Sequence, residues 1–126
     1  MTTLSISETN STPGIELRKG NILFRGKAIS PGSLSIFEAA STWIDFYLKI
    51  PANHTIVNIN FEYIDSSSTQ KMFSILKTII EKTNKGENLD VNWLYDLGDL
   101  EMLQLGELIQ ARLDKEFDFI EMEKQQ

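Results

Sequence analysis

The sequence predicts an α/β protein with a mixed β-sheet, in the element order β-β-α-β-α-β-α-β. Apolar residues recur at helical spacing in three segments, and short apolar or alternating runs lie before and between those segments. A strand followed by a helix and another strand indicates a parallel pair with a right-handed crossover. The first two strands are too close in sequence for a crossover, so we expect an N-terminal antiparallel hairpin and three helices packed on the sheet.

The hairpin is predicted at residues 14–18 and 21–25, with Lys19 and Gly20 as its tight turn. Residues 1–12 are polar and rich in Ser and Thr, so we expect them to be loosely ordered. The length of 126 residues fits one domain spanning 1–126, with no internal boundary.

The later segments alternate between the two periodicities. Pro51 ends the first helix, and the strand after it is apolar enough to be covered on both faces. Gly106 inside the third helix predicts close packing against a neighbouring element. The predicted segments are a helix at 35–50, a strand at 55–63, a helix covering 71–80, a strand at 89–95, a helix from an N-cap at Asp99 to about Leu113, and a strand at 117–120.

Composition narrows the class of partner. The net charge of −6 argues against nucleic acid, whose phosphates attract Lys and Arg surfaces, and favours a protein partner. No apolar run approaches the roughly 20 residues that span a bilayer, and the start lacks the pattern of a signal peptide. The chain has no Cys, which excludes disulfides and thiolate chemistry. We therefore expect a cytoplasmic protein without a membrane partner, cofactor or metal.

Residues 63–70 form a strand-to-helix corner crowded with hydroxyl groups. Ser67 and Gln70 match the Ser-x-x-Gln capping box, which predicts Ser67 as the N-cap and leaves Ser66 one residue outside the helix. A phosphate on Ser66 would lie near the partly positive helix N-terminus. The sequence thus predicts phosphorylation at Ser66, with Ser67, Ser68 and Thr69 as fallback acceptors. The expected partner-binding surface comprises Asp65, Ser66, Ser67, Ser68, Gln70 and Lys71.

Several blocks of the chain together resemble the SiaC-type regulatory phosphoproteins of bacteria. Their order and spacing match that family over almost the whole length. The blocks are Thr12-Pro13, the loop at 26–31, the Trp-containing helix at 43–47, the corner at 63–68, and Trp93-Leu94-Tyr95-Asp96 followed by Asp99, Met102 and Gly106.

The resemblance implies a STAS-like fold, that of the anti-sigma factor antagonists. It also implies phosphorylation by a dedicated Ser/Thr kinase, dephosphorylation by a PP2C-type phosphatase, and activation of a diguanylate cyclase by the unphosphorylated form. That output would raise cyclic di-GMP and favour biofilm formation. Ser66 stands where the family has its modified Thr, and Asp65 stands where it has Asn.

Two other functions remain open at this stage. The Asp65-Ser66-Ser67 triplet is similar to the phosphosite of the anti-sigma factor antagonists, which bind an anti-sigma kinase. Alternatively, Asp65 and Asp96 follow strands that could be neighbours, and carboxylates there could hold Mg²⁺ for phosphoryl transfer. The adaptor is favoured because no base or positioned Lys accompanies the carboxylates.

Overall fold

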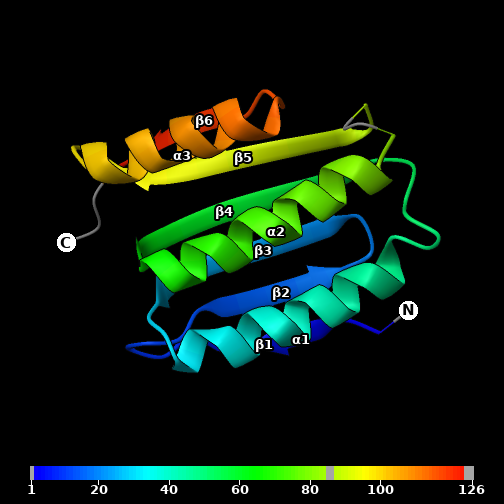
Figure 1. The fold of residues 1–126 in the computed structure, drawn as a ribbon, viewed down its shortest axis with the longest axis horizontal. Helices are drawn as coiled ribbons and strands as arrows, with labels where there is room; N and C mark the ends of the chain where they lie inside the picture. Colours follow the sequence, from blue (N-terminus) through cyan, green and yellow to red (C-terminus); the bar gives the residue numbers. More distant parts are fainter. Residues whose placement is uncertain (1, 85–86, 124–126) are drawn as a thin grey trace.

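The computed structural model describes residues 2–84 and 87–123, in which six strands form one sheet and three helices lie on the same face of it (Figure 1). The strands follow one another across the sheet in sequence order. They are β1 (Leu4–Ile6), β2 (Gly14–Arg18), β3 (Asn21–Ala28), β4 (Thr55–Ile64), β5 (Leu89–Asp96) and β6 (Asp118–Met122). The helices are α1 (Gly32–Tyr47), α2 (Ser66–Lys82) and α3 (Leu100–Leu113).

The strand directions confirm the predicted mixed sheet. β1, β2 and β3 are antiparallel neighbours, and β3 through β6 are parallel. Gly20, with φ of +84°, takes up the left-handed conformation that the hairpin turn between β2 and β3 needs. Each helix connects two adjacent parallel strands, and right-handed connections between adjacent strands place all three helices on one face.

The strand β1 was absent from the predicted element order and lies in the segment expected to be loosely ordered. Leu4 pairs with Leu17 and Ile6 with Ile15, so β1 continues the hairpin as a third antiparallel strand. Leu4 and Ile6 are half-buried against the core. A three-residue strand has too few apolar positions to show a period, so its order comes from β2, which supplies the backbone partners.

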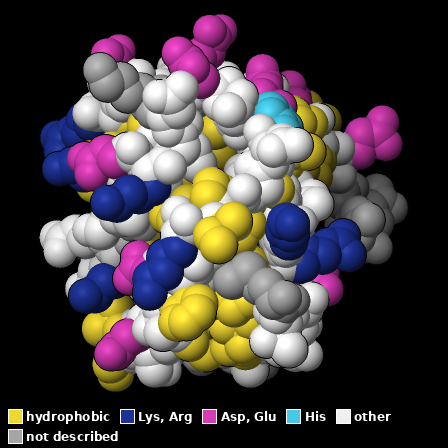
Figure 2. Space-filling view, turned by 90° about the vertical axis from the view of Figure 1, so that its right-hand side faces the viewer, with side chains coloured by type: hydrophobic (Ala, Val, Ile, Leu, Met, Phe, Trp, Pro, Cys, Tyr) yellow, Lys and Arg dark blue, Asp and Glu magenta, His cyan; other side chains and the backbone are white. Residues whose placement is uncertain are grey.

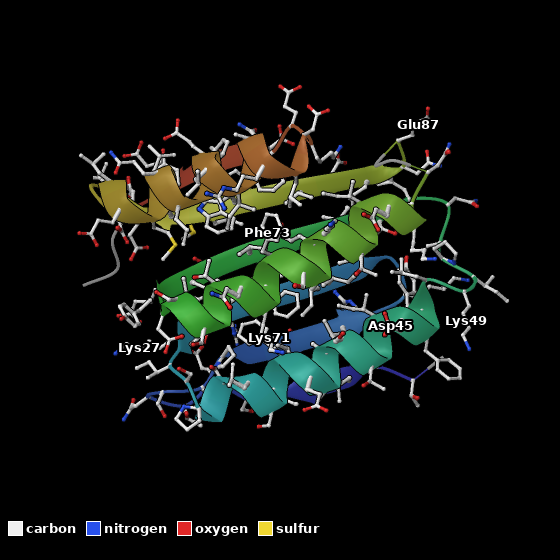
Figure 3. All side chains as sticks on the ribbon, in the orientation of Figure 1. Lys27, Asp45, Lys49, Lys71, Phe73 and Glu87 are labelled. Carbon is white, nitrogen blue, oxygen red and sulfur yellow. The ribbon has the colours of Figure 1, made fainter. Side chains whose placement is uncertain are left out.

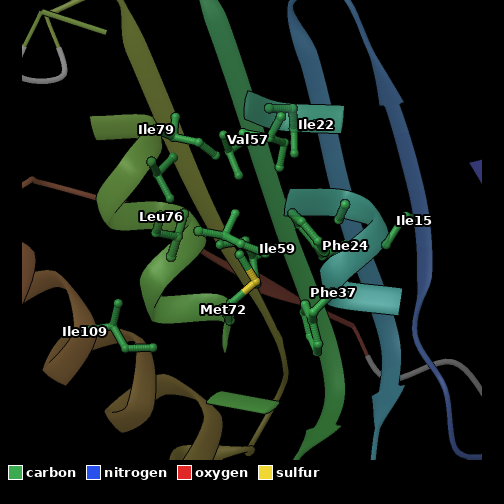
Figure 4. Close-up of a cluster of buried hydrophobic side chains, with 14 of the residues drawn as sticks. Ile15, Ile22, Phe24, Phe37, Val57, Ile59, Met72, Leu76, Ile79 and Ile109 are labelled. Carbon is green, nitrogen blue, oxygen red and sulfur yellow. The ribbon is translucent and has the colours of Figure 1, made fainter. Parts of the chain in front are cut away.

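The core lies between the helices and the sheet. Met72, Leu76 and Ile79 of α2 point toward Val57 and Ile59 of β4 (Figure 4), and all five are fully buried. Their helical and alternating spacings confirm the two periods expected from the sequence.

Only one face of β4 is covered by helices, so the expectation of two covered faces was wrong. Asn58 and Asn60 point to the opposite face and are half-exposed, and the Asn58 side chain accepts a 2.9 Å hydrogen bond from Asn92. The amide groups on this face are compatible with water, as in sheets that pack on one side only.

The bounds of α1 and β6 and one packing detail bear on the sequence predictions. α1 begins at Gly32 and ends at Tyr47, three residues earlier at each end than predicted. β6 runs from Asp118 to Met122, two residues beyond the predicted end at position 120. A Cβ atom on Gly106 would lie 2.5 Å from Nε1 of Trp93, which confirms the close packing expected there.

Within the described residues, no helix combines the length and apolarity needed to cross a membrane.

Candidate functional site

The hydroxyl-rich corner lies where β4 ends and α2 begins. The carboxyl ends of the parallel strands meet at one edge of the sheet, on the left in Figure 1. Asp65 links Ile64, the last residue of β4, to Ser66, the first residue of α2. The connection is short because one residue serves both as strand exit and as helix cap.

Asp65 holds the corner in place through both of its carboxylate oxygens. Oδ1 accepts a hydrogen bond from the Ser68 backbone N–H at 3.0 Å, which caps α2. Oδ2 accepts from the backbone N–H and the hydroxyl of Ser30, each at 2.7 Å. The Asp65 N–H donates to the carbonyl of Ala28 at 3.0 Å. The start of α2 is therefore fastened to the loop between β3 and α1.

The same contacts set the charge state of Asp65. Hydrogen bonds from Ser68 and from both donors of Ser30 lower the pKa of the Asp65 carboxyl well below its ordinary value, against a smaller opposing effect of burial. The carboxylate is thus ionised across the physiological range and is already engaged by donors on both oxygens.

Asp65, and not Ser67, is the N-cap of α2, so the predicted capping box was wrong. A carboxylate accepts the N–H of the third helical residue as well as a hydroxyl does, and Asp65 is stabilised further by Ser30. The helix consequently starts earlier than expected. Ser66 is its first residue rather than a residue outside it, and Ser67 is its second.

The four candidate acceptors differ sharply in access. Ser66 and Ser67 are exposed, and no hydrogen bond among the described residues engages either hydroxyl. Ser68 is 0% exposed, and its hydroxyl forms a 2.6 Å hydrogen bond with that of Ser33 on α1. Thr69 is half-buried and donates to the Asp65 carbonyl at 2.8 Å. Ser66 and Ser67 are therefore the accessible members of the cluster.

The expected partner surface is only partly at the surface. Gln70 and Lys71 are exposed along with Ser66 and Ser67, and Figure 3 shows Lys71 on the side of α2 that faces α1. Ser68 lies inside the protein, so its assignment to a contact surface was wrong. The local sequence around a small polar residue at a helix start is the same whether its side chain faces water or a neighbouring helix, so the sequence does not distinguish the two.

Ser30 and Ser33 were missed as site residues by sequence reasoning. Both come from the loop between β3 and α1 or the first turn of α1, 35 positions before their partners Asp65 and Ser68. The loop at 26–31 is visible in the sequence, but nothing in its spacing indicates which carboxylate it contacts.

Of the two carboxylates considered for Mg²⁺, Asp65 has a structural role instead. Asp65 caps α2, and Asp99 caps α3 by accepting the Met102 N–H at 3.1 Å, as predicted. Asp96 is half-buried at the end of β5. Among the described residues, no group of three or more His, Asp or Glu side chains is arranged to hold a metal ion. The described residues therefore do not provide the set of metal ligands that the phosphotransfer alternative requires.

Comparisons with known proteins agree with this architecture. A family model described as "SiaC family regulatory phosphoprotein" matches residues 6–122. The chain is 26% identical over 121 residues to an uncharacterized protein of Pseudomonas aeruginosa strain UCBPP-PA14, a match that covers 94% of each protein.

Solved structures show the same fold. A structure of SiaC from Pseudomonas aeruginosa matches with a TM-score of 0.80 and 25% identity, covering 98% of this chain and 100% of that one. The crystal structure of apo-SiaC matches with a TM-score of 0.81 and 25% identity, covering 97% and 99%. The structure of the diguanylate cyclase SiaD in complex with its activator SiaC gives 0.79 at 23% identity, covering 96% and 99%.

The fold, the accessible hydroxyls and the family match define this chain as a regulatory phosphoprotein. It belongs to the SiaC family, whose model covers the nine strands and helices of the described residues apart from the first two residues of β1.

Proposed function

We propose that this chain is a non-enzymatic bacterial signalling adaptor whose partner binding is switched by reversible phosphorylation of Ser66. The observation that carries the proposal is the position of Ser66 at the first residue of α2 in a SiaC family chain, with an exposed hydroxyl that no other described residue engages. Ser67 is also exposed, but Ser66 directly follows Asp65, whose carboxylate is hydrogen-bonded to the backbone N–H groups of Ser30 and Ser68.

A phosphate on Ser66 changes the charge of this edge strongly. It adds about −1.5 to −2 charges at neutral pH. The unpaired N–H groups of the first helical turn favour an anion there, whereas the neighbouring Asp65 carboxylate disfavours it. The donors of Ser30 and Ser68 are already hydrogen-bonded to the Asp65 carboxylate. A phosphate on Ser66 would therefore not be drawn inward by these donors and would stay at the surface.

The edge around Ser66 also carries exposed apolar side chains, which suit a protein interface. Ile29 follows β3, Tyr63 lies near the end of β4, and Leu97 follows β5, with exposures of 37%, 52% and 60%. Leu100 at the start of α3 is 63% exposed. An effector that covers this apolar edge would have to desolvate a phosphate on Ser66, so phosphorylation releases it.

The effector that fits best is a diguanylate cyclase, which the unphosphorylated form would bind and activate. Support comes from the shared fold with SiaC, which is named as the activator of the cyclase SiaD. A cytoplasmic Ser/Thr kinase and a PP2C-type phosphatase would set the phosphorylation state, and cyclic di-GMP and biofilm formation would be the output.

Two substitutions at Ser66 test the switch. Ser66→Ala should bind a diguanylate cyclase from the same organism within about twofold of the wild type, and Ser66→Asp should weaken binding about tenfold or more, because a buried unpaired charge costs at least 1 to 2 kcal/mol. Calorimetric titration gives both values. Ser67→Ala and Ser67→Asp are the matched controls on the adjacent exposed position.

The site of modification needs its own measurement. Phosphopeptide mapping of the protein from its own host should place the phosphate on Ser66. Phosphate found on Ser67, or equal cyclase binding by the Ala and Asp variants of Ser66, would contradict the proposed switch.

A further inference from the structure

A second apolar surface lies far from Ser66, beside the outermost strand of the sheet. An open groove of about 600 Å³ runs between β1 and α1 and is lined by Thr2, Leu4, Ala39, Thr42, Trp43 and Phe46. Phe46 is 67% exposed. Figure 2 shows hydrophobic side chains gathered in the lower part of the view, where α1 and β1 lie.

The groove follows a regular stripe on α1, here called the α1 stripe, formed by Ile36, Ala39, Trp43 and Phe46. These positions are spaced by three or four residues and so share one side of the helix. Ile36 and Trp43 pack partly against the core, while the rest of the stripe extends past it. None of the four carries a charge.

Among the described residues, β1 is the terminal strand of the sheet, with β2 as its one strand neighbour, and its other backbone edge is unpaired. The free N–H and C=O groups of such an edge form a template for another strand. An added strand would also cover the groove next to β1, so one occupant satisfies both the backbone edge and the apolar surface.

We propose that the occupant is a second copy of this chain, with β1 of each copy pairing antiparallel about Ser5. In that register Leu4 of one copy lies opposite Ile6 of the other, and all four apolar side chains stay on the helix side of a continuous sheet. A two-fold axis perpendicular to the sheet through Ser5 keeps both α1 helices on that same side, antiparallel to each other.

The α1 stripe is self-complementary in this arrangement. Its N-terminal half, Ile36 and Ala39, is half-buried, whereas Phe46 at its C-terminal end is 67% exposed and protrudes. Antiparallel helices bring the protruding Phe46 of one copy against the half-buried end of the stripe on the other. The stripe itself contains no charged residue, and the charged group that lies 4.7 Å from the centre of the Phe46 ring is the Lys49 ammonium, a cation. The stripe therefore adds no carboxylate to the repulsion between two copies that each carry a net charge of −6.

This association is independent of the proposed Ser66 switch. Ser66 follows β4, three strands away from β1 in the sheet, and its edge stays uncovered in the pair. Failure of the pair would leave the phosphorylation proposal intact, and failure of the switch would leave the pair intact.

Sedimentation velocity from low micromolar to submillimolar concentration tests the association. The wild type should show a monomer–dimer equilibrium. Phe46→Glu should raise the dissociation constant about a hundredfold, since it puts a charge in place of an aromatic side chain that the second copy would cover. Ile50→Glu is the matched control, because Ile50 is 84% exposed beyond the end of α1. Circular dichroism verifies that both variants are folded.

A single cysteine tests the register, since the natural chain has none. Residues opposite each other in antiparallel strands have Cα atoms about 4.5 to 5.5 Å apart, within the range that a disulfide bridges. Oxidised Ser5→Cys should therefore run as a covalent dimer, whereas Ser74→Cys, on the exposed side of α2, should not.

Two results would overturn the proposal. One is a wild type that stays monomeric throughout the concentration range. If Phe46→Glu then also weakens binding of the cyclase, the surface belongs to that partner instead of a second copy. The other is equal cross-linking of the Ser5→Cys and Ser74→Cys variants.

Discussion

Asp65 is the residue on which the geometry of the corner depends. Its carboxylate accepts hydrogen bonds from Ser30 and Ser68 and so joins the loop between β3 and α1 to the start of α2. The residue matters to function indirectly, because it fixes the position of Ser66 without occupying the exposed surface around it.

Replacing Asp65 gives a pH-dependent prediction. Because hydrogen bonds lower its folded-state pKa, Asp65 contributes stability fully above the pKa of an unfolded Asp, about 3.9, and loses that contribution as the pH falls. Asp65→Asn should lower the free energy of unfolding by about 1 to 2 kcal/mol at pH 7, and the difference from wild type should shrink below about pH 4. Urea denaturation at several pH values measures both.

Asp45→Asn is the control for this experiment, since Asp45 is exposed on α1 and should change stability by less than about 0.5 kcal/mol. A difference between wild type and Asp65→Asn that stays constant down to pH 3 would be inconsistent with an ionised cap.

The buried pair of Ser33 and Ser68 gives a prediction at the same scale. Each hydroxyl is fully buried and has the other as its partner at 2.6 Å. Ser68→Ala should cost about 1 to 3 kcal/mol, because it leaves the Ser33 hydroxyl buried without that partner, whereas the double Ala variant should cost less than the sum of the two single changes. Thermal denaturation of all four proteins completes the cycle; strict additivity would show that the two hydroxyls are not coupled.

At the scale of an element, α3 approaches the sheet closely because it contains Gly106. A side chain at that position would meet the Trp93 ring, whose Nε1 donates to the Met102 carbonyl at 2.9 Å. The helix therefore has glycine, a residue of low helix propensity, at the position where the Trp93 ring occupies the space of a side chain.

Gly106→Ala should destabilise the protein although Ala is the better helix former. The helix propensity gain of about 1 kcal/mol is outweighed by overpacking against Trp93, which typically costs about 1 to 3 kcal/mol. A lower melting temperature and altered tryptophan fluorescence are expected. Gln104→Ala, on the exposed side of the same helix, is the control, and a more stable Gly106→Ala variant would refute the packing argument.

At the scale of the whole molecule, the sheet is completed by a strand that is very short. β1 covers the edge of β2 and brings Leu4 and Ile6 against the core. Replacing both by Ser should lower the free energy of unfolding by about 2 to 3 kcal/mol, because half-buried apolar area is lost at two positions. Ser5→Thr changes the opposite face of the same strand and should have little effect. Chemical denaturation distinguishes the two, and equal midpoints would mean that β1 adds nothing to stability.

The sequence by itself determined most of the architecture. The hairpin turn at Gly20, the apolar periods of α1 and α2, the Asp99 cap and the tight packing at Gly106 depend on interactions between residues near in the chain or on a single glycine, and such interactions leave a local pattern. The crossover rule then orders the parallel strands. The candidate Ser66 could be chosen for the same reason, since a strand-to-helix corner with hydroxyl groups is visible locally.

Only the tertiary structure decided which hydroxyl groups of that corner are accessible and which residue caps the helix. Asp65 prevails over Ser67 as the cap because Ser30, 35 positions away in sequence, supplies two further donors. Ser68 is buried because Ser33 of α1 packs against it. Contacts between residues so far apart in the chain depend on how the helices and strands pack together. The sequence pattern alone does not show which of these distant residues meet.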